Sequence, residues 1–130
     1  MQKILLITSL LTITVGVFMI LGGIWGIFFT YKNVARESIT TPPDASIPST
    51  KVRGPLTLKA QSDIIRQHVL HTTEGKTYAQ MPQTEARNIW ITATTLITAL
   101  NLGIVSYALS GIVMFVGVLS ILIGIILFIK

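Results

Sequence analysis

The chain has 130 residues, of which 51% are hydrophobic and only 12% are charged, and its formal net charge at pH 7 is +5. This length corresponds to a single domain, so a multi-domain protein is excluded. The charged fraction is about half of that in an average soluble domain, too little to cover a surface exposed to water. The sequence contains no cysteine, which excludes disulfides, thiol catalysis and cysteine-ligated metal sites.

The charged residues are concentrated in the middle of the chain. Eight of the ten Lys and Arg residues and all five acidic residues lie between Lys32 and Arg87, which gives this stretch a net charge of +3. The basic residues are scattered among the acids, whereas a nucleic-acid-binding protein would show a basic run or basic residues interleaved with aromatics. We therefore interpret residues 32–87 as a polar, membrane-proximal segment and expect no nucleic-acid partner.

No charged residue occurs from Ile4 to Tyr31. About 20 apolar residues cross a bilayer, so residues 1–31 are predicted to form a first transmembrane helix. A cleaved signal peptide is the alternative, because Lys3 precedes the apolar run. Its apolar region would be only about 7–15 residues long and would end at a small-residue cleavage site. The longer run found here ends in aromatic residues and Lys32, which is typical of an uncleaved anchor at the membrane interface.

Within the polar segment, residues 38–55 are predicted to be an extended linker. Three prolines occur in residues 38–50, and proline removes a backbone donor and fixes φ, which disfavours both helix and central strand. The spacing of apolar residues then predicts a short amphipathic helix over about residues 58–73. Thr57 is its expected N-terminal cap and Gly75 its left-handed C-terminal cap. We expect its apolar stripe to rest on the membrane surface or on a partner.

A second stretch without charge extends over 42 residues, from Asn88 to Ile129. Residues 88–101 carry apolar side chains on one side and Asn and Thr on the other, whereas the residues that follow are apolar all round. A helix inside a bilayer has no polar stripe unless it packs in a bundle. We therefore favour an amphipathic interfacial helix over residues 88–101 that leads into a second transmembrane helix over residues 102–130. The alternative is that residues 88–101 form a third span.

Small residues recur at seven-residue spacing along both predicted spans. Such a repeat keeps one face of a helix toward a partner, and small side chains let two backbones approach closely in lipid. The two spans are therefore predicted to pack antiparallel through these faces. The expected helix-packing residues are Ser9, Gly16, Gly23 and Thr30 in the first span and Gly103, Ser110, Gly117 and Gly124 in the second.

Several short motifs give the chain a resemblance to a known family. They are Gly54-Pro55-Leu56-Thr57, Ile64-Ile65, His68-Val69-Leu70 and Gly75-Lys76-Thr77-Tyr78-Ala79-Gln80, followed by Arg87, Ala93-Thr94-Thr95-Leu96 and a Gly-rich last span. The chain resembles small two-span membrane proteins of actinobacteria that have no assigned function, some of which carry a ring-opening dioxygenase label. Family members usually have an acidic middle and an arginine at the position of Ile97, so this chain departs from them at both points.

The dioxygenase label requires a metal site, and one group of residues has suitable ligand types. His68, His71 and Glu74 supply the two imidazoles and one carboxylate of a non-haem iron centre. On one helix, however, their spacing spreads them over about 120°, and Glu74 falls at the helix end. We therefore interpret them as a solvated helix end, and expect no metal, no cofactor and no enzymatic activity.

Two classes of function are compatible with an all-α membrane protein of this kind. The first is a structural or accessory subunit that packs with itself or with a larger membrane complex. The second is a small self-assembling pore or transporter subunit, with the Thr and Asn face of residues 88–101 lining a wet path. Ion and proton carriers usually have a charge inside the membrane, and neither predicted span contains one, so we favour the accessory subunit.

The expected location is the plasma membrane, with two spans and both termini on the same side. The number of basic residues in the middle segment would place that segment in the cytoplasm, but its length is near the limit of the positive-inside rule. Lys3 ahead of a long apolar run is typical of a signal anchor that keeps the N-terminus inside, and Lys130 favours the same side. We therefore expect residues 32–87 to be extracytoplasmic.

Overall fold

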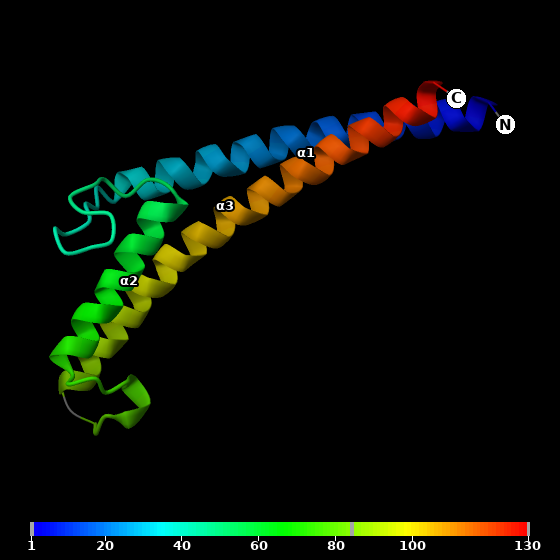
Figure 1. Cartoon of the computed structure of the whole chain (residues 1–130). Helices are drawn as coiled ribbons and strands as arrows, with labels where there is room; N and C mark the ends of the chain where they lie inside the picture. The colour runs from blue at the N-terminus through cyan, green and yellow to red at the C-terminus, as the bar shows by residue number, and fades with distance from the viewer. Residues whose placement is uncertain (1, 84, 130) are drawn as a thin grey trace. The chain divides into compact units, whose positions relative to one another are not determined.

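The computed structural model describes residues 2–83 and 85–129 and is all-helical over these residues, as the sequence predicts. The helices are α1 (Gln2–Arg36), α2 (Pro55–Thr72), the short 3-10 helix η1 (Tyr78–Gln80) and α3 (Glu85–Ile129) (Figure 1). The chain forms two compact units. We call residues 2–30 and 106–129 the terminal unit, and the described residues of 31–105 the middle unit.

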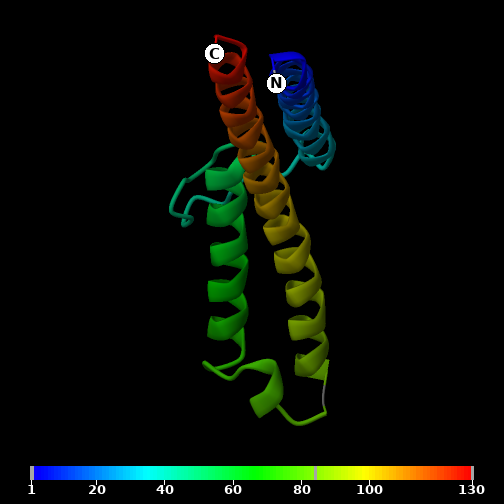
Figure 2. The same ribbon diagram turned by 90° about the vertical axis from the view of Figure 1, so that its right-hand side faces the viewer.

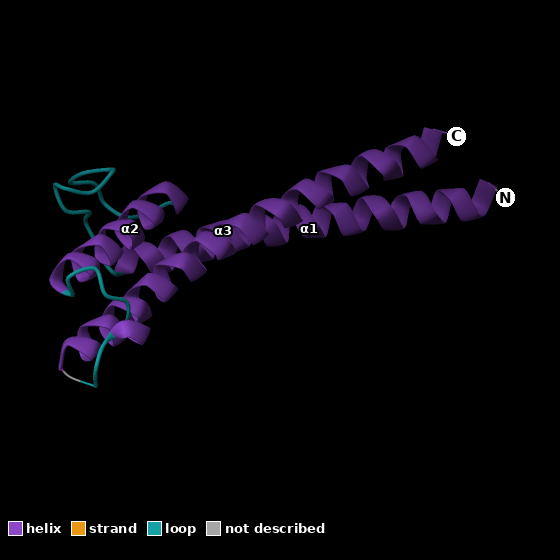
Figure 3. Ribbon diagram, turned by 60° about the horizontal axis from the view of Figure 1, so that its bottom comes forward, coloured by secondary structure: helices purple, strands orange, loops and turns teal. Residues whose placement is uncertain are grey.

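In the terminal unit, α1 and the second half of α3 lie antiparallel, so that the two ends of the chain are close together (Figure 1, Figure 3). Both α1 and the Arg87–Ile129 part of α3 are long and apolar enough to cross a membrane, with mean hydropathies of 2.6 and 3.2 in their most apolar windows. Only 11% of each window is buried, whereas the core helix of a soluble protein is mostly buried. The two predicted apolar helices are therefore present, and their apolar surface is largely uncovered.

In the middle unit, α2 lies antiparallel to the first half of α3 (Figure 2). Trp90 and Ala93 of α3 form a buried cluster with Val69 of α2, and Ile65, Leu70 and Met81 pack around it. The contact extends along both helices, since the buried Ser62 hydroxyl donates a hydrogen bond to Asn101 Oδ1 at 3.2 Å. The buried part of each helix's apolar stripe therefore packs against the other helix, while Ile89 and Leu96 of α3 stay 41% and 50% exposed.

This packing changes the interpretation of residues 88–101. The sequence predicted an interfacial helix that is distinct from the span after residue 101, but α3 continues through this boundary without a break. The most buried part of its apolar stripe, Trp90 and Ala93, is covered by α2 and not left to face a bilayer. Sequence periodicity shows that such a stripe must be buried, but it does not show what covers it.

Helix α2 begins at Pro55, three residues before the predicted start, with Gly54 as its N-cap. Proline is favoured at the first helical position because no N–H is needed there. Thr57 is inside the first turn, where its hydroxyl accepts hydrogen bonds from the N–H groups of Arg53 and Gly54 at 3.0 and 3.1 Å. Thr57 thus satisfies backbone donors ahead of the helix and is not itself the cap.

The C-terminal end of α2 has Gly75 in the left-handed region, with φ of +78°. Its N–H donates to the Leu70 carbonyl at 2.7 Å, and the Glu74 N–H donates to the His71 carbonyl at 3.4 Å. These two bonds form a Schellman motif, which satisfies the last carbonyls of a helix. The residue at the first left-handed position is Glu74, with φ of +53°, so Gly75 is the second of two such residues.

The predicted extended linker is a folded loop. Its two ends meet at an antiparallel bridge between Thr40 and Lys51, with a hydrogen bond from the Val52 N–H to the Ile39 carbonyl at 2.9 Å. The hydroxyl of Thr41, which is 2% exposed, donates to the Ile47 carbonyl at 2.5 Å. Proline does exclude helix and strand here, but hydroxyl side chains that bond to the backbone stabilise turns and order the loop.

Candidate functional site

The most closely packed surface of the terminal unit is the antiparallel contact between α1 and α3. The buried residues of α1 are Ser9, Gly16, Gly23 and Thr30, the same four that the seven-residue repeat singles out. Opposite them, Ser110, Gly117 and Gly124 are the buried residues of α3 within the terminal unit. When the residue number on α1 rises by seven, the number of the facing residue on α3 falls by seven, as expected for an antiparallel pair.

The glycines bring the two backbones into direct contact. A Cβ atom added to Gly16 would lie 2.6 Å from the Gly117 carbonyl oxygen, and one added to Gly117 would lie 2.8 Å from the Gly16 carbonyl oxygen. A Cβ on Gly23 would lie 2.7 Å from the Ser110 carbonyl oxygen. Real Cβ atoms do not approach other atoms this closely, so only glycine fits at these positions. The arrangement also favours weak Cα–H···O contacts, which recur at close helix–helix interfaces.

Hydroxyl groups join the helices on either side of the glycines. Ser9 is fully buried, and its hydroxyl donates to the Gly124 carbonyl at 2.7 Å. Near the other end, the Thr30 hydroxyl donates to the Gly26 carbonyl at 2.8 Å and lies 2.5 Å from Ser106 Oγ. Since the single Thr30 proton is used, Ser106 is the donor in the second bond. Hydrogen bonds between helices in lipid contribute about 0.6 kcal/mol on average, so their main effect is to fix the register.

Gly103 is the one predicted packing residue that does not join this interface. It belongs to the middle unit, where a Cβ on Gly103 would lie 3.1 Å from Leu58 Cδ1 of α2 and 3.8 Å from Val34 Cγ2 of α1. Leu58 is 1% exposed, so the space beside Gly103 accommodates a side chain and not a second backbone. Thr30, which the repeat would pair with Gly103, is bonded to Ser106 instead.

Sequence reasoning missed Ser106. The signal was present, because residue 106 lies three positions after Gly103 and four before Ser110, and therefore on the same helix face.

In the middle unit, a side-chain contact between His68 and Asp44 fixes the loop to α2. His68 Nε2 lies 2.6 Å from Asp44 Oδ2, and both side chains are more than half exposed. His71 and Glu74, the other members of the metal-like set, do not join it, and residues 2–83 and 87–129, whose side chains are described, contain no group of three or more metal-ligating side chains. His68 therefore acts here as a loop contact.

This contact predicts a specific titration behaviour of Asp44. The hydrogen bond from His68 lowers the pKa of the Asp44 carboxyl below its usual 3.8. A lowered pKa means that the contact stabilises the folded loop above pH 3.8 and is lost as the pH falls through the lower, folded value. In an NMR titration of the Asp44 carboxyl, His68→Ala should return its pKa toward 3.8. His71→Ala is the matched control and should leave it unchanged; an equal effect of both substitutions would contradict the contact.

Comparison with known proteins adds no further constraint, since the chain matches no protein-family model, no curated protein and no solved structure.

Proposed function

We propose that this chain is a two-span integral membrane protein that serves as a structural or accessory subunit in a larger membrane assembly. The observation that carries the proposal is the apolar ridge on the face of α1 turned away from α3. This ridge also repeats every seven residues, and its members are 70%, 64%, 71% and 65% exposed: Ile4, Leu11, Phe18 and Trp25. Uncovered apolar area costs about 25 cal/mol per Å² in water, so such a ridge requires lipid or a partner helix.

The contact between α1 and α3 favours a structural role over transport. The close approach of the glycine backbones leaves no room for a water path between the two helices. The exposed hydroxyls of Thr8, Thr12 and Thr14 donate to carbonyls of their own helix at 2.7–2.9 Å, so they do not require water either. A transport pathway would therefore have to form between several copies of the chain.

The proposed topology places both termini in the cytoplasm and the middle unit outside the plasma membrane. It is supported by the antiparallel pairing of α1 with α3, by Lys3 and by the residues that end the first apolar run. Tyr31 and Lys32 are an aromatic and a basic residue of the kind that anchor a span at the headgroup region.

The topology can be tested with one introduced thiol, because the chain has no cysteine of its own. Ser46 is an exposed residue of the folded loop and suits this purpose. We expect Ser46→Cys to react with a membrane-impermeant thiol reagent in intact cells, and the protein to stay in the membrane pellet after alkaline carbonate extraction. Labelling only after lysis would contradict the orientation, and release by carbonate would contradict the membrane assignment itself.

The accessory role is tested separately by reconstitution. The purified full chain in liposomes should give no ion flux above that of protein-free vesicles at any protein-to-lipid ratio. In mild detergent extracts of native membranes, the chain should migrate as a complex much larger than its own 14.2 kDa. Flux that rises steeply with protein density would instead support the self-assembling pore.

A further inference from the structure

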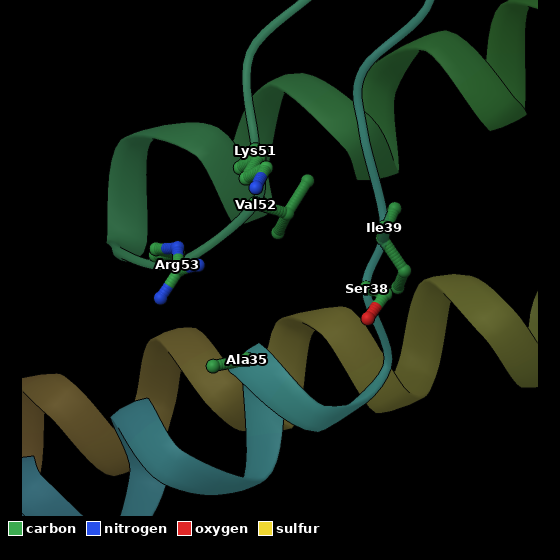
Figure 4. Close-up of a pocket in the computed structure, with 6 residues that line it drawn as sticks. All are labelled: Ala35, Ser38, Ile39, Lys51, Val52 and Arg53. Carbon is green, nitrogen blue, oxygen red and sulfur yellow. The ribbon is translucent and has the colours of Figure 1, made fainter.

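The folded loop of the middle unit encloses a small cavity with a basic lining. Its volume is about 80 Å³, and it is lined by Ala35, Ser38, Ile39, Lys51, Val52 and Arg53 (Figure 4). A single water needs only about 10–15 Å³ measured in this way, so the cavity has room for a larger polar group. Figure 4 shows Lys51 and Arg53 on one side of the loop, opposite Ser38 and Ile39.

The fold fixes the backbone of one basic lining residue and the side chain of the other. Lys51 is held by the backbone bridge to Thr40. Arg53 Nη1 donates to the Tyr31 hydroxyl at 2.8 Å, and the guanidinium carbon lies 5.6 Å from the centre of the Tyr31 ring. The cavity is therefore bordered by two basic residues, and the guanidinium of one, Arg53, is held by Tyr31, the first aromatic residue that follows the terminal unit.

Basic residues outnumber acids in the part of α1 that leads into the cavity. Lys32 lies one turn before Ala35 on the same side of α1, and Arg36 is in the last turn of that helix. Arg36 and Lys51 form no ion pair within the described parts of the chain. Two acids occur between Arg36 and Arg53: Asp44 contacts His68, and Glu37 directly precedes Ser38 of the lining. A pocket of this size with two basic residues and a hydroxyl in its lining suits a phosphate group, which Arg and Lys recognise through charge-assisted hydrogen bonds.

We propose that this cavity binds the phosphate of an anionic phospholipid headgroup. The inference rests on the proposed membrane topology, because Tyr31 then marks the headgroup level and Arg53 is at that level with it. Tyrosine is enriched at this depth of a bilayer. Basic residues near an anionic membrane surface contribute about 1 kcal/mol each, which corresponds to about a fivefold change in affinity.

The test uses the full chain in a zwitterionic detergent and a short-chain phosphatidylglycerol as the probe, with binding measured by calorimetry. We expect phosphatidylglycerol to bind more tightly than short-chain phosphatidylcholine. Lys51→Gln should weaken its binding about fivefold, and Lys51→Arg should restore most of it. The matched control is Lys59→Gln, which removes the same charge from the exposed face of α2 and should change the affinity less than twofold.

Several results would overturn the proposal. These are equal binding of the two lipids, equal weakening by the two Gln variants, or binding of inorganic phosphate as tight as that of phosphatidylglycerol, which would identify a site for the free anion. Arg53→Gln is a second variant that should also weaken binding of phosphatidylglycerol. Its melting curve without lipid shows whether loss of the Tyr31 contact has unfolded the loop. If the loop has unfolded, the proposal is judged on Lys51→Gln alone. Carbonate extraction distinguishes failure of the membrane assignment from failure of the lipid site. A chain that stays in the membrane pellet but binds both lipids equally contradicts only the lipid site.

Discussion

Replacing Gly16 or Gly117 with alanine should weaken the association of α1 and α3 by about 1–3 kcal/mol, the usual cost of overpacking a close contact. The added methyl of Gly16→Ala would lie 2.6 Å from the Gly117 carbonyl oxygen and 3.0 Å from the Ile121 amide nitrogen. Both are backbone atoms that cannot rotate away, so the helices must move apart along their whole contact. The free energy of unfolding, measured by steric trapping in bicelles, should fall by this amount for each variant.

The chain contains matched controls for this experiment. Gly22 lies on α1 and Gly111 on α3, and among the described residues no atom that could obstruct a Cβ lies within 4 Å of either position. Gly22→Ala and Gly111→Ala make the same chemical change outside the interface and should leave the free energy of unfolding unchanged or raise it, because alanine favours helix. If all four variants behaved alike, the effect would come from helix propensity and not from the close approach of the backbones.

The placement of these glycines shows how far the sequence alone predicts the fold. A seven-residue repeat of small residues on two apolar helices has few geometric solutions, because each repeat defines one face, and the two faces can bury each other. Ser9, Gly16 and Gly23 on α1 and their counterparts on α3 could therefore be named without coordinates. The sequence could not show that Gly103 lies outside the contact between α1 and α3, because its position depends on Leu58 from a third helix.

The middle unit was less predictable for a related reason. The sequence indicates two amphipathic helices, but the hydrophobic pattern is the same whether a stripe faces lipid or another helix. Pairing of α2 with α3 depends on a turn that contains η1 and on bonds such as that from Thr73 Oγ1 to the Lys76 carbonyl at 2.8 Å. The cavity beside Lys51 likewise depends on a bridge between residues eleven positions apart, which composition does not reveal.

Trp90 provides the decisive test of this pairing, and we expect Trp90→Ala to destabilise the middle unit by about 3–5 kcal/mol. Trp90 is 4% exposed, packs against Val69 and donates from Nε1 to the Lys76 carbonyl at 2.9 Å. Truncation removes this packing and one of the two hydrogen bonds that the Lys76 carbonyl accepts, the other coming from the Thr73 hydroxyl. In hydrogen exchange on the full chain, the amides of α2 should lose protection, while those of residues 10–28 keep theirs.

The control for size is Trp25→Ala, which truncates an equally large side chain that is 65% exposed. It should leave hydrogen exchange in α2 unchanged. Trp90→Phe retains an aromatic ring but not the donor, and should lose only a small part of the stability, because one hydrogen bond contributes about 1 kcal/mol.

An interfacial Trp90 would behave differently: in a Trp25→Phe background its fluorescence would be quenched strongly by lipids brominated near the headgroup. Because α2 covers Trp90, we expect weak quenching, and strong quenching together with unchanged exchange in Trp90→Ala would show that the two helices do not pack.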